Sequence, residues 1–255
     1  MDKLQTTGAR QRKLKERFTR SMSAGDYDRN AIVQQRGYKQ LVRLIAEHGR
    51  HHYHHTLEVG CGSGGFTQAL CHAIEIDRLT LNDLCPATVI TAPLPPHDYI
   101  QGNAENALFT ARYDLIAAAA AMQWFVRPDR FLEQMAQHLA PRGTLLLSTF
   151  GPENFREIRH LTGRGLAYPT IDELRQWLEP HYQIHALEEE HVTLRFATPH
   201  EVLKHMHDTG VGAASNRPWM MAEYRHFCRL YPTHYAHPDG LPLTYHPIYL
   251  LATRR

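Results

Sequence analysis

The stretch Glu58-Val59-Gly60-Cys61-Gly62-Ser63-Gly64-Gly65 decides the fold class of this 255-residue chain. It follows a short run of strand-forming residues, 56–59, and precedes a segment, 65–75, whose apolar residues recur at helical spacing. Glycines between a strand and a helix allow a tight turn whose backbone N–H groups approach a ligand closely. The stretch therefore predicts a ligand-binding loop at the end of a buried strand.

Strands and helices continue to alternate downstream of this loop. Short apolar runs predict strands at 79–81, 99–100, 113–118 and 144–149, and residues 128–139 have the apolar spacing of a helix. The run at 113–118 is nearly all apolar after its start, as expected of a strand covered on both faces. This succession predicts an α/β fold with a doubly wound, mainly parallel sheet.

The rhythm changes after residue 150. We expect helices around 153–162 and 219–231, capped helices opening at Thr170 and Thr198, and strands over 182–196 and 243–252. The segment 151–180 and the helices around 200–231 are expected to cover the carboxyl edge of the sheet.

Composition excludes several function classes. Lys plus Arg is 28 and Asp plus Glu is 26, which argues against a mainly electrostatic nucleic-acid binder. No apolar run reaches the roughly 18 residues of a membrane span, and the amino terminus lacks the apolar region of a secretory signal. The four cysteines form no C-x-x-C pair, which favours reduced thiols. We expect a cytoplasmic monomer with no nucleic-acid or membrane partner.

Basic residues gather at the amino terminus although the whole chain is nearly neutral. Residues 3–20 hold seven basic side chains against Glu16 alone. Two interpretations stay open: a solvated arm, or a docking surface for an acidic partner.

The glycine loop fits two cofactor templates. Gly60-x-Gly62-x-x-Gly65, with Asp83 placed 23 residues past Gly60, matches a dinucleotide fingerprint. Glu58-x-Gly60-x-Gly62-x-Gly64 matches the loop of methyltransferases that use S-adenosylmethionine. A pyrophosphate prefers a helix N-terminus free of carboxylates, whereas the ammonium of S-adenosylmethionine suits an acid such as Glu58.

Two further segments favour the second template. Gly102-Asn103-Ala104-Glu105 follows the third strand, where methyltransferases commonly place Gly-Asp-Ala-Glu. The side-chain carbonyl of Asn103 can still accept a hydrogen bond from an adenine amino group. The small residues 118–121 after the fourth strand leave room for cofactor and substrate, or pack closely against neighbouring backbone.

These segments resemble the class I S-adenosylmethionine-dependent methyltransferases over residues 50–150. That resemblance implies a Rossmann-like, seven-stranded, mainly parallel sheet with a helical cap, and S-adenosyl-L-methionine as cofactor. It also implies a set of cofactor-binding residues: Glu58, Gly60, Cys61, Gly62, Gly64, Asp83, Leu84, Asn103, Ala104 and Ala119.

A closer resemblance covers nearly the whole chain. It rests on Arg17-Phe18, Tyr27-Asp28, Gln123-Trp124, 148–152 leading to 156–159, 194–196, 202–204, Thr209-Gly210 and 243–245. In these segments the chain resembles the malonyl-[acyl-carrier protein] O-methyltransferases of biotin synthesis, although Leu57-Glu58 stands where members often have Leu-Asp.

The closer resemblance implies an activity and an organisation. The activity is methyl transfer to the free carboxylate of a malonyl group on acyl carrier protein, an acidic partner that the basic residues 3–20 would steer. The ester masks a charge, so that fatty-acid elongation enzymes accept the chain as a primer. A single domain over 1–255 is implied, with an arm and lid helices at 1–48, a cofactor core at 50–150, and cap elements with a late strand at 151–235.

The implied reaction requires alignment of the methyl donor and the carboxylate rather than a general base, because the malonyl carboxylate is already ionised near pH 7. Arg159 is our first candidate for holding that carboxylate, Arg195 is the second, and Tyr27 is expected to close over the cofactor. No metal role is expected, although the segment 51–55, His-His-Tyr-His-His, could chelate an adventitious ion.

Other functions remain open at this stage. One is methylation of another small carboxylate or of a quinone-type carbon, for which a base would come from the histidines at 185, 191, 205 or 207. Another is a non-catalytic, adenosyl-binding partner subunit.

Overall fold

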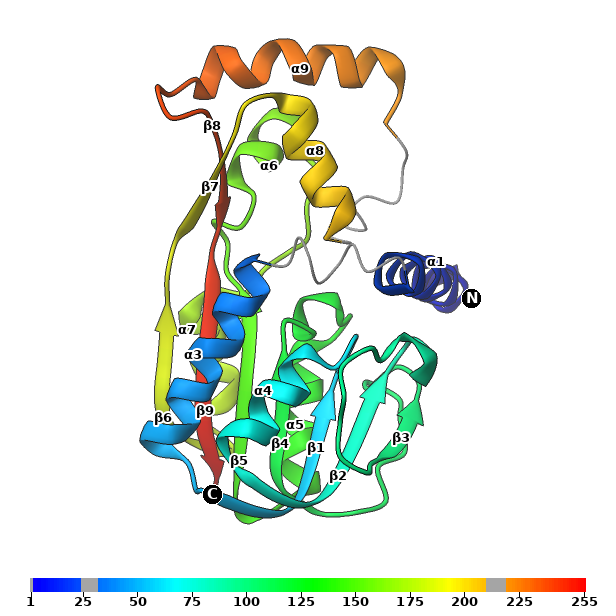
Figure 1. Ribbon diagram of the computed structural model, residues 1–255, viewed down its shortest axis with the longest axis vertical. Helices are drawn as coiled ribbons and strands as arrows, with labels where there is room; N and C mark the ends of the chain where they lie inside the picture. Colours follow the sequence, from blue (N-terminus) through cyan, green and yellow to red (C-terminus); the bar gives the residue numbers. More distant parts are fainter. Residues whose placement is uncertain (1, 24–31, 210–218) are drawn as a thin grey trace. The chain divides into compact units, whose positions relative to one another are not determined.

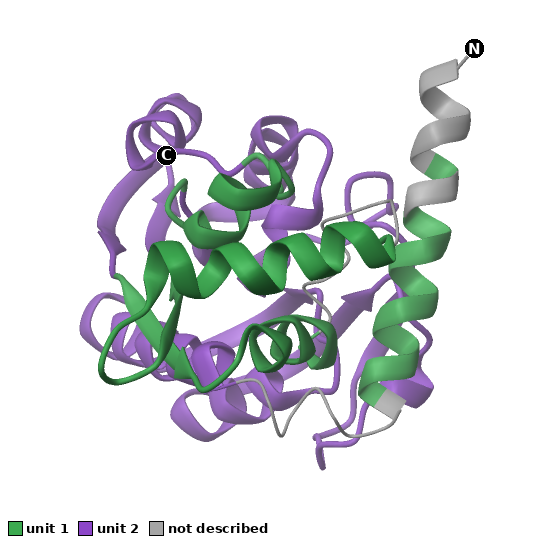
Figure 2. Ribbon diagram, turned by 90° about the horizontal axis from the view of Figure 1, so that it is seen from above, with its two compact units in different colours: residues 1–31, 152–167, 191–246 green, residues 32–151, 168–190, 247–255 purple. Residues whose placement is uncertain are grey.

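The computed structural model describes residues 2–23, 32–209 and 219–255, which form two compact units (Figures 1 and 2). The sheet unit comprises 32–151, 168–190 and 247–255. The described residues of the helical unit are 2–23, 152–167, 191–209 and 219–246.

A seven-stranded sheet organises the sheet unit. Its spatial order is β3-β2-β1-β4-β5-β9-β6, and only β9 runs antiparallel to its neighbours β5 and β6. The strands are β1 (His52–Val59), β2 (Glu75–Asp83), β3 (Asp98–Gln101), β4 (Tyr113–Ala119), β5 (Leu139–Phe150), β6 (Tyr182–Glu189) and β9 (Pro247–Arg254). The predicted doubly wound, mainly parallel sheet of seven strands is therefore confirmed.

Helices cover both faces of this sheet (Figure 1). Side chains of α3 (Ile32–His48) and α4 (Gly65–Ala73) share one buried cluster with Leu115 and Ala117 of β4. Side chains of α5 (Pro128–His138) and α7 (Ile171–Leu178) share the opposite cluster with Ile116 and Ala118. Successive residues of β4 thus face opposite clusters, which explains why nearly the whole strand is apolar. Two short 3₁₀ turns, η1 (Ala87–Val89) and η2 (Met122–Trp124), follow β2 and β4.

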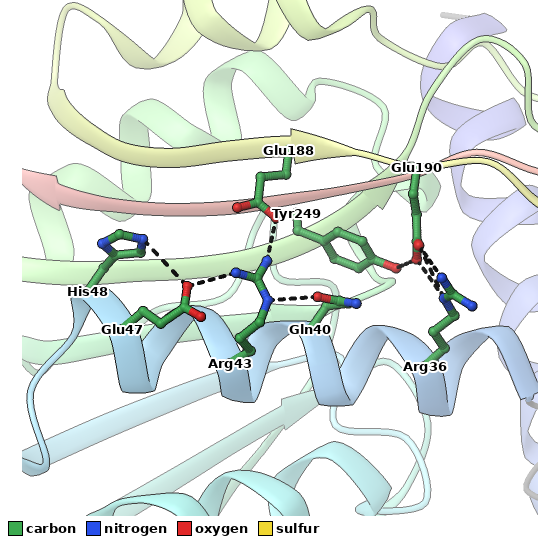
Figure 3. Close-up of polar contacts among 8 residues, drawn as sticks. All are labelled: Arg36, Gln40, Arg43, Glu47, His48, Glu188, Glu190 and Tyr249. Carbon is green, nitrogen blue, oxygen red and sulfur yellow. Dashed lines mark hydrogen bonds and ion pairs between the residues drawn. The ribbon is translucent and has the colours of Figure 1, made fainter.

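Ion pairs hold α3 against the antiparallel edge of the sheet (Figure 3). Arg36 donates to both carboxylate oxygens of Glu190, with its Nη2 2.7 Å from Oε2, and the Tyr249 hydroxyl donates to the same carboxylate at 2.7 Å. Burial alone would raise the pKa of Glu190, but these two partners hold it below its ordinary value. Arg43, two turns further along α3, pairs with Glu188 of β6.

The helical unit combines four helices with a small sheet among its described residues. The helices are α1 (Asp2–Ser23), α6 (Arg156–Thr162), α8 (Pro199–Asp208) and α9 (Met221–Tyr235); β7 (Val192–Phe196) and β8 (Leu241–Tyr245) pair antiparallel. Buried Glu157 of α6 accepts hydrogen bonds from the Thr244 backbone N–H at 3.1 Å and from its hydroxyl at 2.5 Å. Buried His205 of α8 bonds the Tyr245 hydroxyl at 2.8 Å. These contacts anchor both helices to β8.

Two predicted strands are each divided in the structure. The segment 182–196 forms β6 and β7, and the segment 243–252 falls into β8 and β9, so that each half belongs to a different sheet. The breaks fall at Glu190-His191 and at His246. Before the first break β6 pairs with β9 in the large sheet, and after it β7 pairs with β8 in the small sheet. The arm at 2–23 is helical, and α6 begins at Arg156 rather than near 153. In the described part of the chain, no helix combines the length and apolarity required to cross a bilayer.

Candidate cofactor site

The glycine loop lies at the point where the strand order of the sheet reverses. β1 leads to β2 on one side, while β4 lies on its other side, and the carboxyl ends of such strands are where open α/β sheets bind ligands. Gly60 has a φ of +73°, and a Cβ at this position would lie 2.5 Å from the Cβ of Ala121. A residue with a Cβ would clash with Ala121 in this conformation, so this point of the loop requires glycine.

Glu58, the last but one residue of β1, is a buried carboxyl group. Neither of its oxygens has a hydrogen-bond partner among the described residues. Burial raises the pKa of Glu58 to about 8; the Asp83 carboxylate adds to this shift, while the neighbouring Thr67 hydroxyl opposes it without a hydrogen bond of regular geometry. A buried acid without a partner is costly, so a cationic or donor group brought by a ligand would relieve that cost.

Asp83 connects the end of β2 to the glycine loop. Its Oδ2 accepts from the Gly62 backbone N–H at 2.9 Å, and its Oδ1 accepts from the Cys85 backbone N–H at 2.8 Å. Burial raises the pKa of Asp83, and these two backbone donors oppose the shift. Each carboxylate oxygen has a second lone pair, so both can still accept from ligand hydroxyls.

Asn103 occupies the turn after β3. Its Oδ1 accepts from the Glu105 backbone N–H at 3.1 Å, a local turn that leaves one lone pair of the carbonyl for a ligand donor. Glu105 in turn accepts from the backbone N–H groups of Val126 and Arg127, both at 2.8 Å, and so ties this turn to the loop after η2.

Two further residues, Asn82 and Glu105, support the site although the sequence predicts no role for them. Asn82 donates from Nδ2 to the carbonyls of Ile100 at 2.8 Å and Gly102 at 3.2 Å, which holds the ends of β2 and β3 together. Glu105 ends the motif Gly102-Asn103-Ala104-Glu105, but the motif predicts no role for its side chain. The sequence signal for Asn82 is its position: a polar residue beside Asp83 at the end of an apolar strand.

The remaining expected cofactor residues also lie at the carboxyl ends of these strands. Cys61 and Ala104 are buried, whereas Leu84 and Ala119 are partly exposed. Burial raises the pKa of the Cys61 thiol, which removes it as a thiolate nucleophile near neutral pH. The structure therefore brings the ten expected residues to one edge of the sheet, while their contacts with a cofactor stay a prediction.

Two of the three expected catalytic residues, Arg159 and Arg195, belong to the helical unit. Arg159 of α6 is half-buried and donates to the Pro152 carbonyl. Arg195 of β7 is exposed and donates to the Gly240 carbonyl at 3.4 Å. Tyr27 lies outside the described residues. Their expected roles therefore stay predictions.

The chemistry of this edge fits an adenosyl cofactor with an amino-acid tail. Two acids at adjacent strand ends, Glu58 and Asp83, match an ammonium group and ribose hydroxyls respectively. A pyrophosphate offers no donor to the unpartnered oxygens of Glu58, and its negative charge would oppose ionisation of both acids. The orphaned oxygens of Glu58, beside the glycine loop, therefore favour an adenosyl cofactor with an amino-acid tail over a dinucleotide.

Comparisons with known proteins agree with this geometry. A family model described as a methyltransferase domain matches residues 57–147. The chain is 40% identical over 238 residues to the malonyl-[acyl-carrier protein] O-methyltransferase of Haemophilus ducreyi, with 90% of this chain and 92% of that protein covered.

Two solved structures show the same fold at low identity. A protein of Bacillus halodurans C-125 is similar with a TM-score of 0.62 at 16% identity, covering 84% of this chain and 98% of that one. The N-methyltransferase NodS of Bradyrhizobium japonicum, in complex with S-adenosyl-L-homocysteine, has a TM-score of 0.50 at 16% identity and 85% coverage of both chains.

Proposed function

The chain belongs to the malonyl-[acyl-carrier protein] O-methyltransferase family, and we propose that it methylates the free carboxylate of a malonyl group carried on acyl carrier protein. The methyl donor is S-adenosyl-L-methionine. The product is the malonyl methyl ester, which primes pimeloyl synthesis for biotin. The observation that carries this proposal is the 35–40% identity to these relatives over 90–94% of the chain, together with the glycine loop between Glu58 and Asp83.

The cofactor is assigned to the carboxyl edge of the sheet unit. Glu58 would accept from its ammonium group, Asp83 from its ribose hydroxyls, and Asn103 from its adenine amino group. The backbone at Gly60, Gly62 and Gly64 would lie against it, with Cys61, Leu84, Ala104 and Ala119 around it. When bound, this group supplies an electrophilic methyl carbon on a positively charged sulfur.

The substrate supplies the nucleophile. A malonyl carboxylate oxygen would accept the methyl group: a C–O bond would form as the C–S bond breaks, and the sulfur would keep the electron pair. No proton moves, so the protein needs no general base. Its tasks are to align the two groups and to replace the water around the carboxylate.

Arg159 is the residue we assign to that carboxylate. A planar guanidinium matches a carboxylate with two parallel hydrogen bonds and compensates for lost water. Its bond to the Pro152 carbonyl uses Nη2 and leaves the other donors of the fork for a ligand. Arg195 is the second candidate, since its side chain is exposed and its one bond, to Gly240, is long at 3.4 Å.

The amino-terminal helix α1 is the surface we assign to acyl carrier protein. Arg12, Lys13 and Arg20 of this helix are exposed, and an acidic partner would be steered towards them. The side chains of Lys3 and Arg10 lie outside the described part of the chain.

A substrate comparison tests the proposed function. Purified protein is given labelled S-adenosylmethionine with malonyl-acyl carrier protein, malonyl-coenzyme A, free malonate or acetyl-acyl carrier protein. We expect the highest kcat/KM with malonyl-acyl carrier protein and no label in the acetyl carrier, which has no free carboxylate. Transfer to an unrelated acceptor with none to either malonyl thioester would overturn the proposal.

The docking surface has its own test. Replacing Arg12, Lys13 and Arg20 by glutamine should raise KM for malonyl-acyl carrier protein several-fold, and should leave KM for malonyl-pantetheine unchanged. A control variant neutralises three exposed basic residues of the sheet unit: Lys39, Arg130 and Arg142. Equal changes in KM for both substrates, or equal effects of the two variants, would refute docking on α1.

A further inference from the structure

Two histidines and an aspartate converge at the amino end of the sheet, in β1 and the adjacent β2 (Figure 1). His52 and His54 are two residues apart in β1, so their side chains leave the same face of the strand. Tyr53, between them, points the other way and is fully buried. Asp77 of β2 follows Ile76, which pairs with Tyr53, and therefore lies beside His54 in the parallel register.

The three side chains already face one another. His52 Nε2 lies 2.9 Å from Asp77 Oδ1, and His54 Nδ1 lies 2.6 Å from Asp77 Oδ2. The two imidazole rings meet edge to face with centroids 4.7 Å apart. One ligand atom from each residue lies within 4.8 Å of the other two. Among the residues that the structure describes, this is the one group of three or more histidines, cysteines or acids with such spacing.

We propose that His52, His54 and Asp77 bind a divalent transition-metal ion of the zinc class. Imidazole nitrogen and carboxylate oxygen are ligands for such ions, whereas Mg²⁺ and Ca²⁺ prefer oxygen alone. Metal–ligand distances of about 2.0–2.1 Å place two tetrahedral ligand atoms about 3.3 Å apart. The two His–Asp separations, 2.9 and 2.6 Å, are within about 1 Å of that value, so small rotations of exposed side chains suffice. Water completes the coordination, because all three side chains are exposed.

The surroundings favour a cation and fix the strand that carries the histidines. The Asp114 carboxylate accepts from the backbone N–H groups of His54 at 2.9 Å and His55 at 2.7 Å. Glu75, the first residue of β2, pairs with His52 in the register. Three carboxylates thus lie around the two imidazoles, and they lower the electrostatic cost of a divalent ion there.

The ion would serve the fold rather than methyl transfer. Glu58 lies six residue steps after His52 along the extended strand, so the two sites are about 20 Å apart along β1. A metal bound at the amino end links β1 to β2 and stabilises the native state by RT ln(1 + [metal]/Kd). This inference does not rest on the proposed function, and its tests read binding and stability.

Calorimetric titration of the untagged, metal-stripped full chain with ZnCl₂ tests the proposal. We expect one tight equivalent of Zn²⁺ in the native protein, none in the double variant His52→Gln/His54→Gln, and at least tenfold weaker binding in Asp77→Ala. His51→Gln, an exposed neighbour outside the cluster, should bind as the native protein does. MgCl₂ should give no binding.

Thermal unfolding gives an independent readout. Saturating Zn²⁺ should raise the Tm of the native protein and of His51→Gln by a few degrees, but not that of the double variant. Weaker sites on other histidines are common to all variants and cancel in this comparison. Equal zinc stoichiometry and affinity in the native protein and the double variant, or an equal rise in Tm, would overturn the proposal, as would no tight binding by the native protein.

Discussion

Substitution of Gly60 by alanine probes the loop at its tightest point. The added Cβ would lie 2.5 Å from the Cβ of Ala121, whereas non-bonded carbons prefer about 3.5–4.0 Å. Overpacking of this kind typically costs about 1–3 kcal/mol. The φ of +73° adds about 1–2 kcal/mol for any residue with a Cβ. The free energy of unfolding should therefore fall by about 2–5 kcal/mol, measured by urea denaturation of the ligand-free protein.

A second substitution separates the two costs. Removing the opposing methyl group in Gly60→Ala/Ala121→Gly should restore about 1–3 kcal/mol, the steric part, and leave the backbone part in place. Gly163→Ala is the matched control: Gly163 has a φ of +64°, but nothing lies within 4 Å of its Cβ position, so only the backbone cost of about 1–2 kcal/mol is expected. Purely additive losses for Gly60→Ala and Ala121→Gly would refute the close approach of these two residues.

Three further predictions concern charged groups. The pKa of Glu58 is raised from its ordinary 4.5 to about 8, so its contribution to stability is present below pH 4.5 and is lost as the pH rises through about 8. Urea denaturation should show this decline in the native protein and not in Glu58→Gln, and parallel pH profiles of the two proteins would contradict the prediction. Arg159→Ala should lose malonyl methylation by at least a hundredfold while S-adenosylmethionine binding, read by calorimetry, is unchanged; full activity would remove Arg159 from the site. Arg36→Gln should lower the free energy of unfolding by at most about 1 kcal/mol near neutral pH, because the ion pair of Arg36 with Glu190 lies at the surface (Figure 3). This difference from the native protein should vanish as Glu190 is protonated in acid, and a difference that persists there would assign the effect to packing instead.

The cofactor edge was predictable because its signals are local. Glycines at fixed offsets require particular backbone conformations, and a run of apolar residues such as 113–118 requires burial on both faces. Asp83 shows the limit of such signals. Its position at a strand end follows from the sequence, but its two hydrogen bonds to Gly62 and Cys85 depend on how the loop folds back, which no local pattern states.

The sequence did not predict where the two long strand runs pass from one sheet to the other, and the reason is physical. Strand-forming side chains occur on both sides of Glu188-Glu189-Glu190-His191 in the run 182–196, and nothing in that run states that its halves pair with different partners. The break at Glu190 is explained by tertiary contacts, since its carboxylate is held by Arg36 and Tyr249 from distant parts of the chain. Pro247, which lacks a backbone N–H and opens β9, was the local sign of the second break.

The sequence indicates the substrate less clearly than the cofactor, and the proposed reaction explains this difference. A carboxylate that attacks without losing a proton requires no base, so the protein carries no catalytic group with a diagnostic pattern. What it requires is one cation at the right distance, and the chain has 28 lysines and arginines. Arg159 differs from an ordinary surface arginine in being half-buried and anchored through one nitrogen to Pro152. An arginine fixed in this way loses less side-chain entropy when it binds a carboxylate, which is a physical reason to test it before Arg195.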